Sequence, residues 1–203
     1  MTNKIIGIQG DKLDKINISS DTSIFLAHEA QKLGYKIFYY TPSNLSIIKN
    51  KTYANGVFVK FNYERKKFYK IYKKQKIDVE NLKFILIRQD PPFNSEYLIT
   101  TLILDDLKKT RVINNPVAIR NVSEKLYSKK FTKYMPDTIF SNNIEEVKKF
   151  YKQNKSIIMK PINGYGGNQI HLIKNKFNKK LITNFLKRNG HSCLLYTSDA
   201  ADD

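Results

Sequence analysis

The chain has 203 residues, 41% of them hydrophobic and 12% aromatic, which is enough for one large domain or two small domains with buried cores. No apolar run approaches the roughly 20 residues of a membrane-spanning helix, and the first residues show no signal-peptide pattern. The single cysteine, Cys193, excludes a disulfide framework and a cysteine-based metal site. We therefore expect a cytoplasmic protein with no membrane partner.

The formal net charge of +18 raises the question of a nucleic-acid-binding surface. Most of the cations are lysines, which are spread along the chain with one denser stretch at residues 60–76. Lys, Asn, Ile, Tyr and Phe are all encoded by A/T-rich codons, so genome composition alone could produce this bias. We expect a solvated basic surface that does not bind nucleic acid, and keep a nucleic-acid-binding module as an alternative.

Residues 1–121 have the pattern of an α/β unit. Residues 4–8 and 36–40 are predicted strands, and Asp21 supplies the N-cap of a helix between them. Gly34 suits the left-handed conformation that ends helices. The buried face of this helix is predicted to consist of Phe25, Leu26, Ala30 and Leu33. Strand, helix and strand with short links predict a parallel sheet.

The rest of this unit adds two strands and a helix. Residues 57–61 are predicted as an edge strand and residues 84–87 as a buried strand. The aromatic and basic segment 61–72 either stacks on single-stranded nucleic acid or, more commonly for such a stretch, forms an amphipathic helix. Ser95 is predicted to cap a long helix whose apolar side consists of Ile99, Leu102, Ile103 and Leu107.

Residues 122–191 predict a second unit of α+β type. Strands are expected at residues 138–140, 156–160 and 169–173, and helices at residues 123–131 and 181–188. A further helix starts at a capping box formed by Asn143 and Glu146. Its buried face is predicted to consist of Ile144, Val147, Phe150 and Tyr151.

The last dozen residues, 192–203, differ in composition from the rest of the chain. They contain three Asp and no Lys or Arg, although the chain as a whole is rich in lysine. We expect this segment to be a foreign tail, such as translated sequencing-adapter read-through. The chain would then stop within its second domain.

A glycine-rich loop lies between the two apolar strands at residues 156–160 and 169–173. Gly164, Gly166 and Gly167 flank Tyr165, and glycine allows backbone N–H groups to approach an anion closely. Lys160 closes the first strand, where a cation is unfavourable unless a negative group meets it. The pattern indicates phosphate binding, with a plain tight hairpin as the alternative. It is neither a Walker A loop nor a dinucleotide-binding turn.

Arg88 follows the strand at residues 84–87, at the carboxyl end where open α/β sheets bind ligands. Its guanidinium could hold a substrate carboxylate through two hydrogen bonds. Alternatively, Asp90 and the two prolines after it only turn the chain, while Arg88 pairs with a neighbour. Lys125, taken alone, is an ordinary surface lysine. The three histidines are not spaced as metal ligands, and they are His28, His171 and His191.

Taken together, four segments resemble the prokaryotic glutathione synthetase family in order and spacing over about residues 1–190. They are Asp21-Thr-Ser-Ile-Phe with its helix, Ile87-Arg-Gln-Asp-Pro-Pro-Phe93, Ile113-Asn-Asn-Pro116 through Ser123-Glu-Lys-Leu126, and Ile157-Ile-Met-Lys-Pro-Ile-Asn-Gly-Tyr-Gly-Gly167. The Arg-x-Asp-Pro-Pro-Phe element is the most specific to this family. The lysine and glycine element is shared by ATP-grasp enzymes in general.

The resemblance implies an N-terminal parallel-sheet (pre-ATP-grasp) domain at residues 1–121, followed by the first lobe of an ATP-grasp domain at residues 122–191. It implies ATP binding by Lys125, Lys160, Gly164, Tyr165, Gly166 and Gly167. Binding of γ-glutamylcysteine would involve Arg88, Asp21 and Ser23. No catalytic residue and no metal ligand is assigned to this chain.

The family's reaction joins γ-glutamylcysteine to glycine through an acyl phosphate, with ATP and Mg²⁺. The magnesium ligands, the second lobe and the cover loop of the family have no counterpart in this sequence, so the chain is expected to be inactive alone. The resemblance also implies a homotetrameric full-length protein. The alternatives are another ATP-grasp carboxylate–amine ligase, such as a D-alanine-adding type, the nucleic-acid-binding module, or a non-functional fragment.

Overall fold

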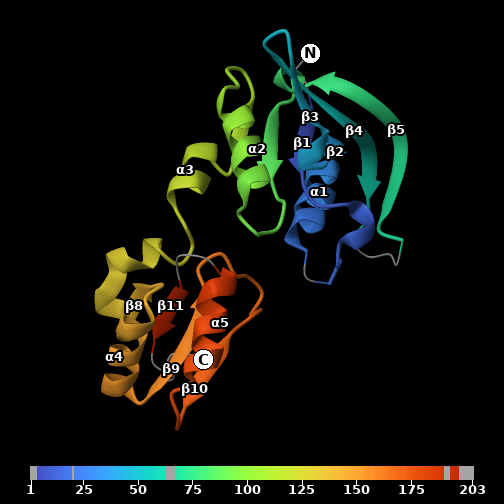
Figure 1. The fold of residues 1–203 in the computed structure, drawn as a ribbon. Coiled ribbons are helices and arrows are strands. Elements are labelled where there is room, and N and C mark those ends of the chain that lie inside the picture. Colours follow the sequence, from blue (N-terminus) through green and yellow to red (C-terminus); the bar gives the residue numbers. More distant parts are fainter. Residues whose placement is uncertain (1–3, 20, 63–66, 190–192, 197–203) are drawn as a thin grey trace. The chain divides into compact units, whose positions relative to one another are not determined.

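A computed structural model describes residues 4–19, 21–62, 67–189 and 193–196. The chain divides into two compact units, residues 1–121 and residues 122–203 (Figure 1). Each unit has its own sheet and its own buried core. In the described ranges, every helix is too short or too polar to cross a bilayer.

The first unit is built on a mixed sheet in the order β3-β4-β2-β1-β6-β7, with β5 paired to β4. Strands β2, β1, β6 and β7 run parallel to one another, whereas β4 is antiparallel to β2, β3 and β5. The predicted parallel sheet is therefore confirmed, with an antiparallel extension. The strand bounds are β1 Ile5–Gln9, β2 Lys36–Tyr40, β3 Leu45–Ile48, β4 Lys51–Phe61, β5 Tyr69–Asp78, β6 Phe84–Ile87 and β7 Arg111–Ile113.

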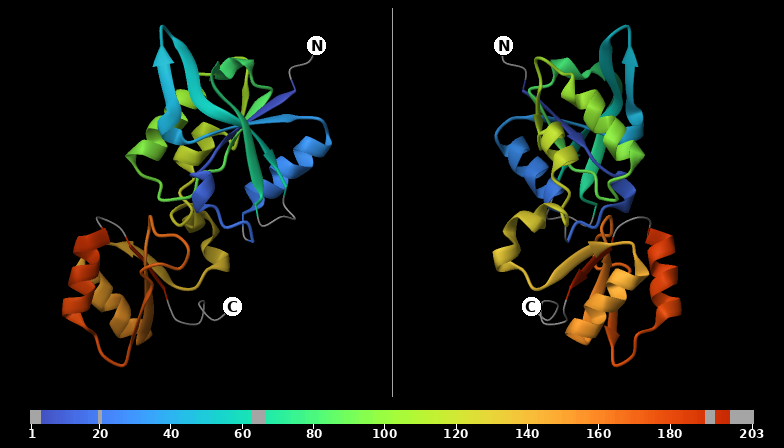
Figure 2. Two further views of the ribbon diagram at one scale, coloured as in Figure 1. Left: turned by 90° about the vertical axis from the view of Figure 1, so that its right-hand side faces the viewer. Right: turned by 60° about the vertical axis from the view of Figure 1, so that its left-hand side comes forward.

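Helices cover both faces of this sheet (Figure 2). Helix α1, Thr22–Lys32, packs through Ile24 and Ala27 on the face that carries Ile37 and Tyr39 of β2. Helix α2, Ser95–Asp105, packs through Leu104 on the opposite face. Successive residues of a strand point to opposite faces, so β2 serves both cores. The remaining helices of the unit are α3 Pro116–Asn121 and the 3₁₀ turns η1 Leu13–Lys15, η2 Pro42–Asn44 and η3 Val79–Asn81.

Helix α1 begins as predicted, because the Asp21 carboxylate accepts the backbone N–H groups of Ser23 and Ile24 at 2.6 and 3.2 Å. Gly34 follows the helix with φ +82°, also as predicted. The predicted buried face is wrong. Phe25, Leu26 and Leu33 are exposed, and the helix buries side chains on its other side. These buried side chains are Ser23, Ile24 and Ala27.

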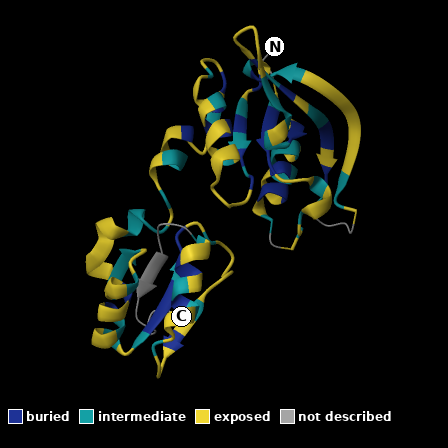
Figure 3. Ribbon diagram, in the orientation of Figure 1, coloured by how far each residue is buried: buried dark blue, intermediate teal, exposed yellow. Residues whose placement is uncertain are grey.

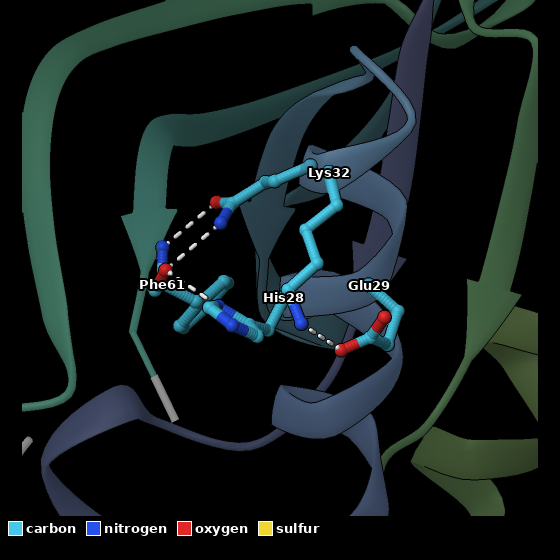
Figure 4. Close-up of polar contacts among 5 residues, drawn as sticks. His28, Glu29, Lys32 and Phe61 are labelled. Carbon is cyan, nitrogen blue, oxygen red and sulfur yellow. Dashed lines mark hydrogen bonds and ion pairs between the residues drawn. The ribbon is translucent and has the colours of Figure 1, made fainter. Parts of the chain in front are cut away.

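Helix α1 is fastened to the end of β4 by side chains of its last two turns. The Gln31 amide donates to the Phe61 carbonyl and accepts the Phe61 N–H, both at 2.8 Å, as a neighbouring strand would. His28 Nδ1 lies 3.3 Å from the same carbonyl, and Lys32 pairs with Glu29 at 2.7 Å (Figure 4). His28 is thus a structural residue.

Helix α2 also departs from prediction at its start and on its buried face. Its N-cap is Asn94, whose side chain accepts the Tyr97 N–H at 2.9 Å, and Ser95 is the first helical residue. Ile99 and Leu102 are exposed. The fully buried residues are Thr100, Thr101 and Leu104, and the two threonine hydroxyls donate to carbonyls three residues earlier.

Two predictions for the segment after β3 are wrong. Residues 57–61 belong to β4, which is an interior strand because it pairs with β2 on one side and β5 on the other. The lysine-rich segment from Tyr69 onward is a strand, β5, and not an amphipathic helix. Most of its residues are exposed (Figure 3). Lysine side chains are a common way to keep an edge strand from pairing with other chains.

The second unit has a four-stranded antiparallel sheet in the order β10-β9-β11-β8. Its core lies between the sheet and helices α4 and α5, where Val147, Phe150 and Ile182 are buried against Ile157 and Met159 of β9. The predicted α+β lobe is therefore confirmed. The bounds are β8 Thr138–Ser141, α4 Ile144–Asn154, β9 Ser156–Pro161, β10 His171–Lys174, α5 Lys179–Asn189 and β11 Cys193–Tyr196.

Details of this unit correct three local predictions. Residues 123–131 do not form an α-helix: a turn is followed by the 3₁₀ helix η4, Tyr127–Tyr134. Asn143 caps α4 as predicted, but through the N–H of Glu145, while Glu146 pairs with Lys149. The returning strand starts at His171, two residues later than predicted.

Of the predicted foreign tail, only Cys193–Tyr196 is described, as the backbone of β11. Its other positions lie outside the described residues, as does His191. The origin of the tail stays a prediction.

Candidate functional site

The loop that joins β9 to β10 has the backbone that its glycines predict. Gly166 and Gly167 have φ values of +58° and +71°, a region that other L-residues rarely adopt. The loop begins with a turn in which the Gly164 N–H donates to the Pro161 carbonyl at 3.1 Å. Tyr165, Gly166 and Gly167 are exposed, so their backbone is accessible to a ligand.

Lys125 lies in the turn before η4 and contacts this glycine loop directly. Its Nζ donates to the carbonyls of Gly164 at 2.5 Å and Ile162 at 3.3 Å. The side chain is only 13% exposed, and it forms an ion pair at 3.8 Å with Glu124, whose side chain is largely solvated. The Ser128 hydroxyl donates to the Lys125 carbonyl and thereby closes the turn that carries this lysine.

Lys160 is the half-buried cation near the end of β9, after the buried residues Ile157, Ile158 and Met159. Burial lowers the pKa of its ammonium group, and the charge of Lys125 lowers it further. Lys125, which contacts the glycine loop, and Lys160, near the end of the strand before it, thus place two positive charges on segments that adjoin this loop.

The first unit brings Arg88 and the start of α1 together. Arg88 follows β6, and its Nε donates to the Ser23 hydroxyl at 3.0 Å, while its Nη2 donates to the Thr22 hydroxyl at 2.6 Å. Ser23 is buried, and its N–H is held by Asp21. The three residues predicted to bind substrate, Arg88, Asp21 and Ser23, therefore form one cluster.

Acidic side chains contribute to the electrostatics of this corner. The Asp11 carboxylate accepts the backbone N–H of Asp90 at 2.8 Å, and the Asp11 carbonyl accepts the Tyr39 hydroxyl at 2.6 Å. Burial raises the pKa of the Asp90 carboxyl, the charges of Asp11 and Asp21 raise it further, and Arg88 opposes them. Burial, with smaller contributions from the same carboxylates, also raises the pKa of Tyr39. The corner combines one guanidinium with three carboxyl groups.

Two glutamines support this corner and were not found from the sequence. Gln9 ends β1, Gln89 follows β6, and the Gln9 Nε2 donates to the Gln89 Oε1 at 2.5 Å in a fully buried position. The Gln9 Oε1 is buried without a hydrogen-bond partner among the described residues. The detectable signal was a glutamine at or just after the end of an apolar strand in both places, but their pairing depends on β1 and β6 being neighbours.

Models of two protein families match this chain. The N-terminal domain of prokaryotic glutathione synthetase matches residues 5–120, and the ATP-grasp domain of the same enzyme matches residues 124–198. Together they cover nearly the whole sequence. The chain belongs to the prokaryotic glutathione synthetase family. The second match overlaps most of the segment predicted as a foreign tail.

Curated glutathione synthetases support this membership. That of Mesorhizobium japonicum is 37% identical over 163 residues, which cover 80% of this chain and 52% of the relative. That of Buchnera aphidicola subsp. Acyrthosiphon pisum is 35% identical over 171 residues, covering 83% and 53%. That of Wigglesworthia glossinidia brevipalpis is 34% identical over 194 residues, covering 94% and 61%. The chain thus spans slightly more than half the length of these curated relatives.

Solved structures agree on the fold. D-cycloserine synthetase DcsG matches with a TM-score of 0.59 at 12% identity, covering 95% of this chain and 59% of that one. D-alanyl-alanine synthetase A from Vibrio cholerae matches with a TM-score of 0.58 at 14% identity, covering 98% and 61%. A RimK domain ATP-grasp protein from Sphaerobacter thermophilus matches with a TM-score of 0.58 at 10% identity, covering 95% and 63%. These likenesses show an ATP-grasp fold of which this chain forms part.

Proposed function

We propose that the full-length protein is a glutathione synthase, which ligates γ-glutamylcysteine to glycine with ATP, and that this chain supplies a phosphate-binding part and a substrate-binding part. The observation that carries the proposal is the contact of Lys125 with the glycine loop that follows Lys160, in a member of this family. In this reaction ATP would activate the C-terminal carboxylate of γ-glutamylcysteine, so that the glycine amine can displace phosphate.

The phosphate-binding part is assigned to the second unit. Lys125 and Lys160 would share the negative charge of the transferring phosphates, and the loop Gly164, Tyr165, Gly166 and Gly167 would cover them with backbone N–H groups. Lys125 is held by two carbonyls of that loop, so a bound phosphate and the loop would compete for its hydrogens. This arrangement couples loop position to nucleotide binding.

The substrate-binding part is assigned to the Arg88 corner. γ-Glutamylcysteine carries carboxylates and a free α-amino group, and the corner offers a guanidinium next to the carboxyl groups of Asp11, Asp21 and Asp90. A guanidinium binds a carboxylate through two parallel hydrogen bonds, and a carboxylate accepts hydrogen bonds from an ammonium group. The corner is therefore complementary to an amino-acid zwitterion, with Ser23 orienting the arginine.

The magnesium ion of the proposed reaction is not assigned to residues of this chain. In the described ranges, no group of three or more His, Cys, Asp or Glu side chains is arranged to hold a metal ion. A homotetrameric full-length protein and a cytoplasmic location are further parts of this proposal that rest on family membership alone.

Binding and turnover measured separately test the proposal. We expect calorimetric titration of the 203-residue chain to show binding of ATP and of γ-glutamylcysteine, and a coupled ADP-release assay with glycine to show no turnover. The full-length protein carrying this sequence should release ADP only when γ-glutamylcysteine and glycine are both present. Turnover by the 203-residue chain would refute its predicted inactivity.

D-Alanine is the discriminating control, because D-alanine-adding ligases are the nearest alternative of the same fold. We expect no ADP release by the full-length protein when D-alanine replaces both substrates. A preference for D-alanine, or the absence of ATP binding to either protein, would overturn the assignment.

A further inference from the structure

The first unit contains a wide cavity, open to solvent, that Arg88 does not line. Its volume is about 780 Å³, within the range of small-molecule sites, and it lies between the β4–β5 hairpin and the turns η1 and η2. Arg88, Ser23 and Asp90 do not line it, although Tyr39, whose hydroxyl binds the Asp11 carbonyl, does. The functions proposed above leave this cavity unused.

One wall of the cavity is formed by β4 and β5. Lys74 is paired with Val57 and Lys76 with Asn55, and directly paired residues of antiparallel strands lie on the same face. This is the face that packs on α1, because Val57 and Tyr69 belong to that core. Lys76 is oriented by the ring of Tyr53, with its Nζ 4.9 Å from the ring centre.

The opposite wall is formed by the chain after β1. The Tyr39 hydroxyl donates to the Asp11 carbonyl at 2.6 Å, and the Gly10 N–H donates to the Tyr40 carbonyl at 3.1 Å, so this segment is held against β2. Gly10 allows the close approach, since a Cβ there would lie 2.3 Å from the Tyr39 oxygen. Lys12 and Leu13 follow and line the cavity.

The lining offers many more hydrogen-bond donors than acceptors. Lys12, Lys74 and Lys76 line the cavity against a single acid, Asp14, and none of the three lysines makes an ion pair with another described residue. The Asn44 oxygen already accepts the Thr41 N–H and hydroxyl, at 3.3 and 2.7 Å, which leaves its amide nitrogen for a ligand.

Apolar surface lies beside these donors. Leu13, Val57 and Ile71 line the same cavity, together with the rings of Tyr39 and Tyr69. A site with three exposed lysines, one acid and an apolar wall suits an anionic ligand that also has an apolar part. We propose that this cavity binds a small molecule in which a dianionic phosphate or dicarboxylate group is joined to an apolar body.

Phenyl phosphate is the probe for this site, followed through the backbone amide signals of the ¹⁵N-labelled chain. We expect the signals of Val57, Lys74 and Lys76 to shift on titration, with tighter binding than for inorganic phosphate, which lacks the apolar body. Phthalate distinguishes the two anion sources: tighter binding of phenyl phosphate identifies a phosphate ligand, and tighter binding of phthalate identifies a dicarboxylate. Inorganic phosphate binding as tightly as both would overturn the proposal.

A matched pair of double variants separates this cavity from diffuse surface charge. Lys74→Gln with Lys76→Gln should weaken probe binding by about tenfold, as expected for loss of charge-assisted hydrogen bonds. Lys70→Gln with Lys73→Gln removes the same charge from the same strand, but these side chains do not line the cavity, so binding should change less than about twofold. Equal weakening in the two variants would overturn the proposal.

Two further readouts complete the test. Any shifts of the Gly166 and Gly167 amide signals report binding at the glycine loop of the second unit. They should be the same in both double variants. Loss of binding at the glycine loop can therefore be told apart from loss of binding at the cavity of the first unit. A single-stranded oligonucleotide should bind no more tightly than phenyl phosphate. Tighter oligonucleotide binding that both double variants weaken equally would replace the small-molecule site with an extended polyanion surface.

Discussion

Arg88 in the first unit and Lys160 in the second are both cations at the end of a buried strand, but their surroundings are opposite in character. Arg88 donates to two hydroxyls and lies among the carboxyl groups of Asp11, Asp21 and Asp90. Lys160 lies beside a second cation, Lys125, and its pKa is lowered as a result of burial and of that charge. Arg88 is thus held by hydroxyl groups in an acidic setting, whereas the charge near Lys160 is positive.

This contrast separates two kinds of recognition. An arginine that already has hydrogen-bond partners gains little from a simple anion. A zwitterion can do more, because its carboxylate can replace the hydroxyls as partners of the arginine while its ammonium group binds the nearby carboxylates. Two lysines beside one glycine loop favour a polyanion, because both ammonium groups can share its negative charge. The proposal therefore places amino-acid recognition in the first unit and phosphate recognition in the second.

The largest expected effect is that of Lys160→Met on nucleotide binding. Loss of a charged hydrogen-bonding group should weaken ATP affinity by about 10- to 100-fold in calorimetry. Because the pKa of Lys160 is lowered in the folded protein, its charged form destabilises the fold at neutral pH. The free energy of unfolding of the ligand-free variant should consequently rise slightly, as measured by denaturant titration.

Lys174→Met is the matched control, since Lys174 is an exposed lysine at the end of the neighbouring strand β10. It should change neither ATP affinity nor the free energy of unfolding by more than experimental error. If Lys160→Met binds ATP as tightly as the unchanged chain does, Lys160 has no role in ATP binding. The proposed contrast between the two sites would then be wrong.

Arg88→Gln should have the next largest effect, and on the other ligand. We expect γ-glutamylcysteine affinity to fall about tenfold through loss of charge-assisted hydrogen bonds, while ATP affinity stays unchanged. Arg111→Gln removes an exposed arginine at the start of β7 and serves as the control. If Arg88→Gln lowered the affinity for ATP as much as the affinity for γ-glutamylcysteine, the two ligands would not be recognised by separate sites.

Much of this architecture follows from local sequence patterns. The Asp21 N-cap, the left-handed Gly34 and Gly166, the buried strand before Lys160 and the apolar face of α4 are all set by residues within a few positions of each other. The glycine loop and its lysine were found in the same way. Family resemblance, and not local pattern, connected Lys125 to that loop.

Features that depend on distant neighbours were missed. The contact of Ser23 with Arg88, 65 positions away, determines which face of α1 is buried. Ser23 lies in the first turn of the helix and faces inward to make this contact. Phe25 and Leu26 then turn outward, although a pattern of apolar residues alone predicts the reverse. Segment 69–78 is a strand because β4 offers it an open edge, and this pairing overrides its resemblance to an amphipathic helix.

Acidity should affect the two sites in opposite directions. Phosphate binding needs the Lys160 ammonium, so ATP affinity should fall as pH rises through its lowered pKa, and Lys160→Met should abolish that dependence. Amino-group binding needs the Asp90 carboxylate, so γ-glutamylcysteine affinity should fall as pH decreases through its raised pKa. Asp90→Asn should flatten the second profile only. Titrations over pH that show both affinities falling in the same direction would contradict the contrast.

The smallest expected effect comes from the loop itself. A Cβ at Gly167 would meet no atom within 4 Å, so Gly167→Ala tests only the positive φ of +71°. Holding alanine in that conformation costs about 1–2 kcal/mol. Because the loop is exposed, it can relax when no ligand is bound, and the strain should appear mainly as a several-fold loss of ATP affinity. The free energy of unfolding should change little.

Gly164→Ala provides the contrast within the same loop. Gly164 does not have a positive φ, but a Cβ there would lie 2.9 Å from the Pro161 side chain, and its carbonyl accepts the Lys125 ammonium. Displacement of that carbonyl should release Lys125 and lower the free energy of unfolding as well as ATP affinity. If both alanine variants lose only ATP affinity, the contact of Lys125 with the loop contributes nothing to the folded state, and the lysine is held in place by its turn alone.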